Sequence, residues 1–284
     1  MSRAGVFSCA SLCWMLVALS GCGASVTPTS ATSASSNFAD SRGSITSDPA
    51  LAVLLSDAAF EGVIALHNDS TSTIQCSDEA ACVVRERPAS TFKIANAIIA
   101  LETGVAPSAE LMIPWDGVTR QVEAWNHDHT LRSAMAASAV PYYQEIARRI
   151  GLTRMQAGVN SLTYGNRQIG TVVDRFWLDG PLAISPLEQI QFLERLATGA
   201  LPISERTQSI VKDILTLDQT DGVLRGKTGW ADPDSDHEIG WFVGWLERDS
   251  ARTYVAVLLR RGNHAEDEFR NARRQIAERA LRAQ

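Results

Sequence analysis

Residues 88–96, PASTFKIAN, place the hydroxyl of Ser90 three residues before the amine of Lys93. If a helix begins here, the two side chains lie on one face, one turn apart. A serine hydroxyl is a poor nucleophile until a neighbouring base takes its proton, and a lysine can be that base when burial lowers its pKa. The apolar neighbours Phe92 and Ile94 favour burial. Taken alone, the pair also fits a capping serine and a surface lysine.

Three further short motifs follow along the chain. Ser138 opens SAV at 138–140, directly before a proline and a helical run, which places a second hydroxyl at a loop–helix junction. The tripeptide YGN at 164–166 predicts a turn, and KTGW at 227–230 ends a strand-like run. Gly229 in that run would let a ligand approach the backbone closely. Each motif is common, but their combination in this order favours one shared site.

The elements that must position these residues are strands at both chain ends with helices between and after them. Alternating or β-branched runs predict strands, and helical spacing with caps predicts helices, most clearly at 185–199, where Ser185 and Glu188 form a capping box and Gly199 ends the helix. The expected strands are 61–69, 72–76, 82–86, 222–230, 239–248 and 252–260, and the other expected helices are 51–60, one from about 90, 138–151, 152–159 and one near 269–281. This pattern predicts an α/β (α+β type) fold: an antiparallel sheet from both chain ends, flanked by helices, with an inserted helical subdomain.

The motifs together resemble the class D β-lactamases, the oxacillinase group of serine penicillin-recognising enzymes. The resemblance rests on STFK at 90–93, SAV at 138–140, YGN at 164–166, FWLDG at 176–180, KTGW at 227–230, PWDG at 114–117 and FRNARRQIAE at 269–278. Class A relatives carry Ser-Asp-Asn where this chain has residues 138–140. The similarity extends from residue 50 to the end and implies a catalytic domain at 50–284 with the fold of serine β-lactamases and penicillin-binding transpeptidases.

The resemblance implies a role for each catalytic residue. Ser90 would attack the lactam carbonyl, and Lys93, converted to a carbamate by CO2, would act as the general base for acylation and for hydrolysis of the acyl-serine. Trp177 would donate its indole N–H to the carbamate. Ser138 would pass a proton to the lactam nitrogen, and Lys227 would supply positive charge. Apart from CO2 or bicarbonate, no cofactor is expected.

The resemblance also implies a substrate-binding set. Thr228 would hydrogen-bond the substrate carboxylate, and Arg270 matches the carboxylate-binding arginine of the family. The backbone N–H groups of Ser90 and Trp230 would form the oxyanion hole. The remaining residues expected around the substrate are Gly229, Val140 and Leu178, the last two as apolar walls, and Trp125 at the mouth of the cleft.

The N-terminal residues read as an export segment. Residues 1–21 resemble a signal peptide, and Leu19-Ser20-Gly21-Cys22 resembles a bacterial lipobox in which Cys22 receives lipid; ordinary cleavage near Ala24 is the alternative. The Ser/Thr-rich residues 22–49 read as a flexible tether. The expected location is the periplasm of a Gram-negative bacterium, with the lipid in the outer membrane because Gly23 is not aspartate.

Other partners and sites are weighed from composition. The formal net charge is −6 with no basic run, so nucleic acid is not an expected partner. His127 and His129 could share a strand face, but no third ligand with metal spacing is evident, and no metal is expected. Cys76 and Cys82 flank a polar turn, and they form either a short disulfide, which persists in exported proteins, or two free thiols.

The sequence therefore predicts an enzyme that hydrolyses β-lactams, penicillins of the oxacillin type among them, and so confers antibiotic resistance. Two alternatives share the serine and lysine motifs. One is a penicillin-sensing receptor domain, and the other is a DD-peptidase or transpeptidase of the cell wall. Both are acylated with little turnover, so the rate of deacylation separates them from the hydrolase.

Overall fold

The structure is a computed structural model that describes residues 44–233, 235–249 and 251–283. The expected signal peptide, the lipidation site at Cys22 and the tether up to residue 43 lie outside these residues. Among the helices that the structure describes, none is both long and apolar enough to cross a membrane.

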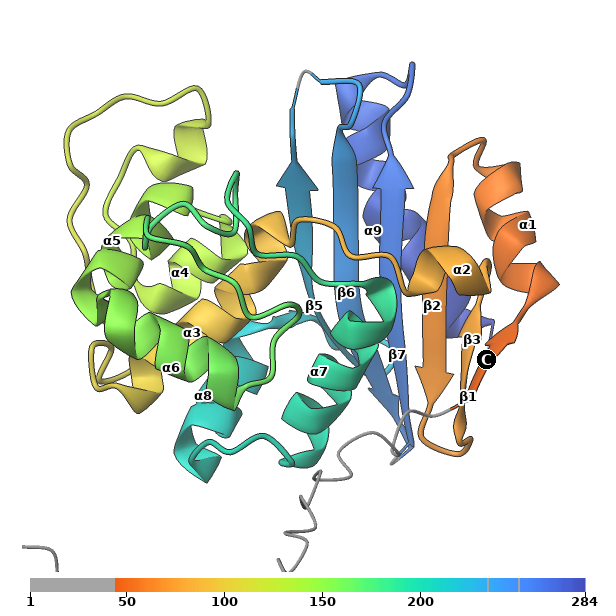
Figure 1. Cartoon of the computed structure of the whole chain (residues 1–284), viewed down its shortest axis with the longest axis horizontal. Coiled ribbons are helices and arrows are strands. Elements are labelled where there is room, and N and C mark those ends of the chain that lie inside the picture. Colours follow the sequence, from red (N-terminus) through yellow and green to blue (C-terminus); the bar gives the residue numbers. More distant parts are fainter. Residues whose placement is uncertain (1–43, 234, 250, 284) are drawn as a thin grey trace, which may run out of the picture. The chain divides into compact units, whose positions relative to one another are not determined.

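A seven-stranded sheet forms the centre of the described domain, in the order β1-β3-β2-β7-β6-β5-β4 (Figure 1). Its strands are β1 Ser44–Ser47, β2 Gly62–Asn68, β3 Thr73–Cys76, β4 Thr216–Asp218, β5 Val223–Ala231, β6 Ile239–Arg248 and β7 Ala251–Arg260. β1 pairs parallel with β3, and every other pair is antiparallel. The two chain ends meet where β2 pairs with β7, with Val63 opposite Leu258. The expected sheet from both chain ends is confirmed.

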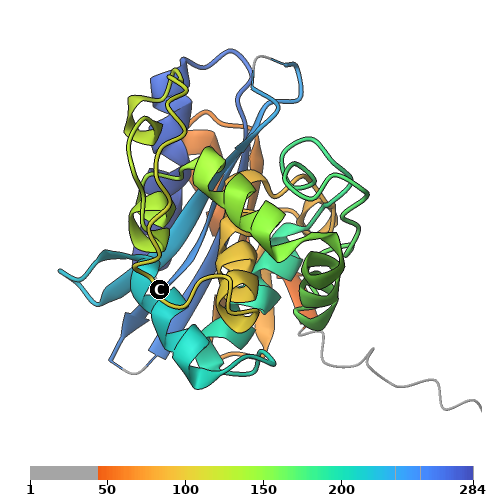
Figure 2. The same cartoon turned by 90° about the vertical axis from the view of Figure 1, so that its left-hand side faces the viewer.

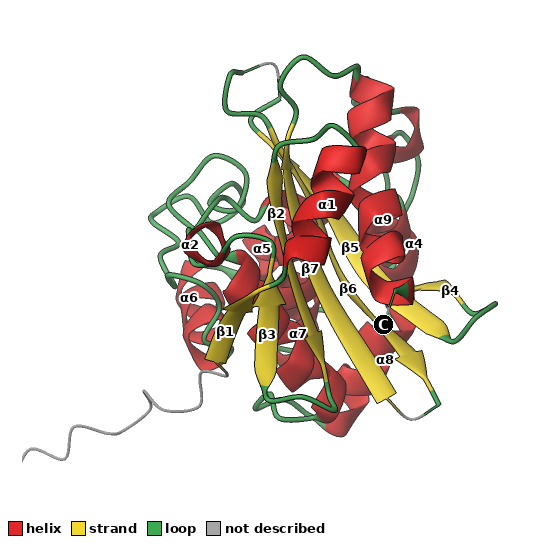
Figure 3. Cartoon of the chain, turned by 90° about the vertical axis from the view of Figure 1, so that its right-hand side faces the viewer, coloured by secondary structure: helices red, strands yellow, loops and turns green. Residues whose placement is uncertain are grey.

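Helices cover both faces of this sheet. The α-helices are α1 Pro49–Asp57, α2 Glu79–Cys82, α3 Lys93–Glu102, α4 Leu131–Ala136, α5 Val140–Ile150, α6 Leu152–Ser161, α7 Pro186–Thr198, α8 Glu205–Ile214 and α9 Glu266–Arg282, and the 3₁₀ helices are η1 Ala89–Phe92 and η2 Glu123–Trp125. α1 and α9 pack on one face (Figure 3). α7 packs on the other face, and α3 to α6 and α8 extend beyond it; Figure 2 looks onto this helical part. These helices are inserted between β3 and β4, as the sequence predicts.

The strand sequences explain the two-sided packing. In β2, Val63 and Ala65 belong to the hydrophobic cluster under the inserted helices, whereas Ile64 and Leu66 belong to the cluster under α1 and α9. Successive side chains of a strand point to opposite faces. A continuous apolar run therefore indicates a strand that is covered on both sides.

Local signals are confirmed in one helix and fail in two other segments. The capping box of Ser185 with Glu188 and the left-handed Gly199 bound α7 as expected. The strand expected at 82–86 is wrong. The short helix α2, capped by Asp78, ends at Cys82, and of the following residues only Glu86 pairs, in an isolated bridge with Ile184. β1 also lies inside the expected tether, because pairing with β3 extends the domain to residue 44.

Cys76 and Cys82 form a disulfide. Cys76 at the end of β3 is bonded to Cys82 at the end of α2, with the two Cα atoms 6.3 Å apart. Both side chains are fully buried. Of the two possibilities that the sequence left open, the short loop-closing disulfide is confirmed.

Candidate active site

Ser90 lies in the 3₁₀ turn η1, which runs directly into the buried helix α3. Nine of the ten α3 residues are buried, Lys93 among them with no exposed surface. The Lys93 Nζ donates to Ser90 Oγ at 2.5 Å and lies 3.5 Å from Ser138 Oγ. Burial, and then the nearby charge of Lys227, lower the pKa of Lys93 well below its usual value. The structure therefore holds Lys93 as a weakly basic amine against the Ser90 hydroxyl.

Two other elements bring Ser138 and Lys227 to the same point. Ser138 lies between α4 and α5 with φ of 52°, a strained left-handed conformation for a non-glycine residue. Lys227 on β5 donates to Ser138 Oγ at 2.9 Å and to the Thr228 carbonyl at 3.0 Å. Burial, and then the charge of Arg273, lower the pKa of Lys227 to about 7. Thr228 Oγ1 lies 3.4 Å from the same amine.

Trp177 is fully buried and stacks on Phe92, with ring centroids 5.4 Å apart. Among the described residues its indole Nε1 finds no hydrogen-bond partner. Burial of a donor without a partner is unfavourable. This N–H is therefore a candidate to bind an acceptor from a bound or attached group. Val140, the first residue of α5, and Leu178 are partly exposed, and Leu178 packs against the same core.

The YGN turn fixes the loop that carries Trp177. The Asn166 side chain donates to the Pro181 carbonyl at 2.8 Å and accepts from the Ala183 N–H at 3.2 Å. A Cβ on Gly165 would come within 2.2 Å of the Ala183 carbonyl oxygen, and its φ is 53°. The motif therefore ties the end of α6 to the loop that follows Trp177.

Gly229 packs against the turn that carries Ser90. A Cβ at this position would come within 2.9 Å of the Pro88 carbonyl oxygen and 3.1 Å of Thr91 Cγ2. The turn that carries Ser90 therefore occupies the space that a side chain of residue 229 would fill. Any side chain on Gly229 would push that turn away from β5.

Two arginines of α9, Arg270 and Arg273, lie beside β5 and differ in burial and contacts. The guanidinium of Arg270 is exposed, pairs with Glu266 at 3.6 Å and stacks over the Trp230 ring at 5.0 Å. Arg273 is 6% exposed and donates to the Gly229 carbonyl at 2.6 Å. Its charge also reaches Lys227, so Arg273, which sequence reasoning missed, is the arginine beside the β5 residues of the site.

Gly240 is the signal that could have identified Arg273. A Cβ on Gly240 in β6 would lie 2.4 Å from Arg273 Cδ, so the glycine opens a path across the sheet for this side chain. The indole of Trp230 points to the same side, donates to Glu238 at 2.6 Å and lies edge-on to Phe269. The Trp230 side chain therefore packs in the hydrophobic cluster on the α9 face of the sheet.

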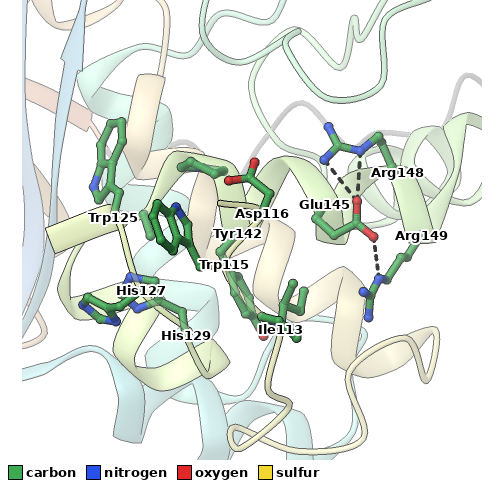
Figure 4. A pocket seen from close by; sticks show the side chains of 13 residues that line it. Ile113, Trp115, Asp116, Trp125, His127, His129, Tyr142, Glu145, Arg148 and Arg149 are labelled. Carbon is green, nitrogen blue, oxygen red and sulfur yellow. Dashed lines mark hydrogen bonds and ion pairs between the residues drawn. The ribbon is translucent and has the colours of Figure 1, made fainter. Parts of the chain in front are cut away.

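Trp125 lies in the wall of a cavity of about 250 Å³ (Figure 4). Its Nε1 donates to the Ala137 carbonyl at 3.1 Å, one residue before Ser138. The cavity is lined by Ile113, Pro114, Trp115, Asp116, Trp125, His127, His129, Ala139, Pro141, Tyr142, Glu145, Arg148 and Arg149. Trp125 therefore supports the segment that carries Ser138.

The two histidines of this cavity do not assemble a metal site. Their rings lie 4.1 Å apart, and both His129 nitrogens are engaged, one with Ser133 and one with the Ala124 carbonyl. Across residues 44–283, apart from the undescribed 234 and 250, no group of three or more His, Cys, Asp or Glu side chains is placed to hold a metal ion.

Comparison with known proteins places this arrangement in a family. Residues 51–282 match the family model of the penicillin binding protein transpeptidase domain. β-Lactamase OXA-48 of Klebsiella pneumoniae is 44% identical over 203 residues, which are 69% of this chain and 74% of the relative. β-Lactamase OXA-10 of Pseudomonas aeruginosa is 39% identical over 217 residues, covering 75% of this chain and 82% of the relative.

Solved structures agree with the sequence relatives. A class D β-lactamase, YbXI from Nostoc, superimposes with a TM-score of 0.78 at 40% identity, covering 82% of this chain and 97% of that one. FUS-1 (OXA-85), a class D β-lactamase from Fusobacterium nucleatum, gives 0.79 at 34% identity, covering 84% and 98%. With its serine and two lysines gathered on this scaffold, the chain belongs to the class D serine β-lactamases.

Proposed function

We propose that this class D enzyme hydrolyses penicillins, those of the oxacillin type among them, through an acyl-serine intermediate in which Lys93 carries the general base as a carbamate. Family membership supports β-lactam hydrolysis as such. The observation that carries the finer mechanism is the buried amine of Lys93, 2.5 Å from Ser90 Oγ, in a site where Trp177 offers an unpaired N–H.

The residues around Lys93 fit a carbamate. The low pKa leaves part of the amine neutral, and only a neutral amine can attack CO2. The new N–C bond leaves a carboxylate once the amine has released one proton to solvent, and this carboxylate supplies an anionic base in a pocket from which bulk water is excluded. Trp177 Nε1 is a buried donor without a partner among the described residues, and the Trp177 ring stacks on Phe92 to form an apolar wall. Such an anion needs hydrogen bonds to persist when buried.

The remaining steps follow from the contacts of the other residues. The Ser90 hydroxyl faces Lys93, so its proton leaves toward that side chain while the oxygen attacks the lactam carbonyl. The Ser90 and Trp230 N–H groups stabilise the oxyanion, and one such donor contributes roughly 3 kcal/mol in other hydrolases. Ser138, bonded to Lys227 at 2.9 Å, returns a proton to the lactam nitrogen.

Substrate binding falls to the cationic end of the site. Lys227 and Thr228 lie together on β5, and the buried guanidinium of Arg273 adjoins them at Gly229. These groups suit the carboxylate that penicillins carry beside the lactam ring. We assign to Arg273 the role expected for Arg270, because Arg273 lowers the pKa of Lys227 and donates to the Gly229 carbonyl.

The test is steady-state hydrolysis of a penicillin by the purified chain, in CO2-depleted buffer and with added bicarbonate. We expect multiple turnovers whose rate rises with bicarbonate. In the same assay Lys93→Ala loses about 10²- to 10⁴-fold, the usual contribution of a general base. A single stoichiometric burst that persists in bicarbonate would instead indicate a sensor or a transpeptidase, and unchanged turnover in Lys93→Ala would refute the role of Lys93.

Export and lipid attachment at Cys22 are the cellular part of the proposal, supported by the lipobox-like residues 19–22. The protein would then act in the periplasm from an outer-membrane anchor and so confer β-lactam resistance on its host. Incorporation of labelled palmitate that is lost in Cys22→Ser tests this. Cleavage near residue 24 without label would favour ordinary secretion.

A further inference from the structure

A buried hydroxyl behind the nucleophile closes the turn that presents it. Thr91 has no exposed surface, and its Oγ1 donates to the Pro88 carbonyl at 2.8 Å. Between these two residues, Ala89 has φ of 47°, a conformation that costs free energy for any residue with a Cβ. The hydroxyl bond therefore holds a strained turn whose next residue is Ser90.

A glutamine of α7 holds that hydroxyl in turn. Gln189 Nε2 donates to Thr91 Oγ1 at 2.9 Å, and the Gln189 side chain is fully buried. Its Oε1 meets no partner at hydrogen-bond geometry in the described part of the chain. The buried hydroxyl of Tyr164 adjoins both side chains: burial raises the Tyr164 pKa, and interaction with Thr91 and Gln189 partly lowers it. Burial of incompletely paired polar groups is unfavourable, and the neighbouring Ile190 shows that this part of α7 otherwise packs apolar side chains. Packing alone therefore does not account for an amide here.

The same threonine also contacts the strand that supplies the second oxyanion donor. Thr91 Cγ2 and the Pro88 carbonyl pack directly on Gly229 of β5, next to Trp230. One residue upstream, the Arg87 carbonyl accepts from Trp241 Nε1 at 2.9 Å. The turn is therefore hydrogen-bonded to β6 at Arg87 and to α7 through Gln189, and it packs against β5 at Gly229.

We propose that Gln189 is a positioning residue that acts through Thr91 to fix the hydroxyl and the N–H of Ser90 relative to Lys93 and β5. This inference rests on the proposed acyl-serine mechanism, because it assigns Gln189 no contact with substrate. Loss of the amide allows the strained turn to relax, so both acylation and deacylation slow. The binding groups on β5 stay in place.

The experiment compares Gln189→Met with the matched control Gln191→Met on the same helix, in the full chain. A penicillin whose hydrolysis is followed by its absorbance reports kcat and KM, and active-site titration with a labelled penicillin normalises the rates to the competent fraction. We expect kcat per titrated site to fall roughly tenfold in Gln189→Met, the effect of one buried hydrogen bond. KM should change less than twofold, and Gln191→Met should match the parent chain.

A second pair of variants tests the link through Thr91. Thr91→Val keeps the shape of the side chain and removes the hydroxyl, so it should be as slow as Gln189→Met; Thr91→Ser keeps the hydroxyl and should restore most of the rate. Full kcat per titrated site in Gln189→Met with a lowered melting temperature would overturn the proposal in favour of packing alone. Thr91→Ser as slow as Thr91→Val would overturn it as well.

The reaction of the unmodified chain with a β-lactam distinguishes failure of the proposed hydrolysis from failure of the proposed role of Gln189. If that chain is acylated without turnover, hydrolysis fails as the function, and the ratio of acylation rates still tests Gln189. If it does not react with β-lactams at all, both proposals are overturned. If Gln189→Met does not fold, the near-isosteric Gln189→Glu replaces it. An unchanged kcat in both Gln189→Glu and Thr91→Val would refute the positioning of Ser90 through Gln189 and Thr91.

Discussion

Replacement of Trp177 by phenylalanine tests the carbamate more directly than loss of Lys93 does. Phenylalanine keeps an aromatic ring beside Phe92, which now stacks at 5.4 Å, and removes the indole N–H. That N–H has no partner within the described residues. The substitution therefore removes the donor that the proposed carbamate on Lys93 would use.

The expected size of the effect follows from that single bond. A hydrogen bond to a charged group contributes about 1.5–3 kcal/mol, which corresponds to about a 10- to 150-fold change in an equilibrium constant. We therefore expect the bicarbonate concentration that gives half-maximal kcat to rise by this factor in Trp177→Phe. At saturating bicarbonate most of the activity should return, because Ser90 and Lys93 remain in contact.

The assay measures kcat against bicarbonate in CO2-depleted buffer, and ¹³C-bicarbonate NMR follows the carbamate carbon itself. Trp245→Phe is the matched control, because Trp245 is also fully buried but its Nε1 already donates to Glu247 at 3.0 Å. Its bicarbonate midpoint should equal that of the parent chain. An unchanged midpoint in Trp177→Phe, or a loss that bicarbonate never restores, would refute the reasoning.

Three further predictions concern charge and stability. Arg273→Gln should raise KM for a penicillin by about tenfold or more, as expected for a lost charged contact, whereas Arg270→Gln should change it less than twofold; equal effects would contradict the assignment. Lys227 has a pKa of about 7 and must be cationic to hold the substrate carboxylate, so kcat/KM of the parent chain should fall above about pH 7. Because the charge of Arg273 lowers the pKa of Lys227, Arg273→Gln should move this fall to higher pH. An unshifted pH profile would show that the two charges do not interact. Replacing Cys76 and Cys82 together by serine should lower the free energy of unfolding in urea by about 2 kcal/mol, the value for so short a loop, with kcat retained.

Local features of this protein follow from the sequence because they depend on neighbouring residues. The spacing of Ser90 and Lys93 places both on one helical face whatever surrounds them, and their contact at 2.5 Å bears this out. Likewise Ser185 and Glu188 cap α7 within a single turn of chain. The alternating and apolar runs also sufficed for the sheet from both chain ends, since strand faces repeat every two residues.

Features that need distant partners were decided by tertiary structure. Arg270 and Arg273 are one turn apart on α9, and the sequence could not show that Gly240 opens a path by which Arg273 reaches Gly229. Gly229 is required by the turn that it packs against, 138 residues upstream at Thr91, and Gln189 meets that turn from 98 residues away. Periodicity fixes which side chains share a face, but only the packing of separate elements fixes which faces meet.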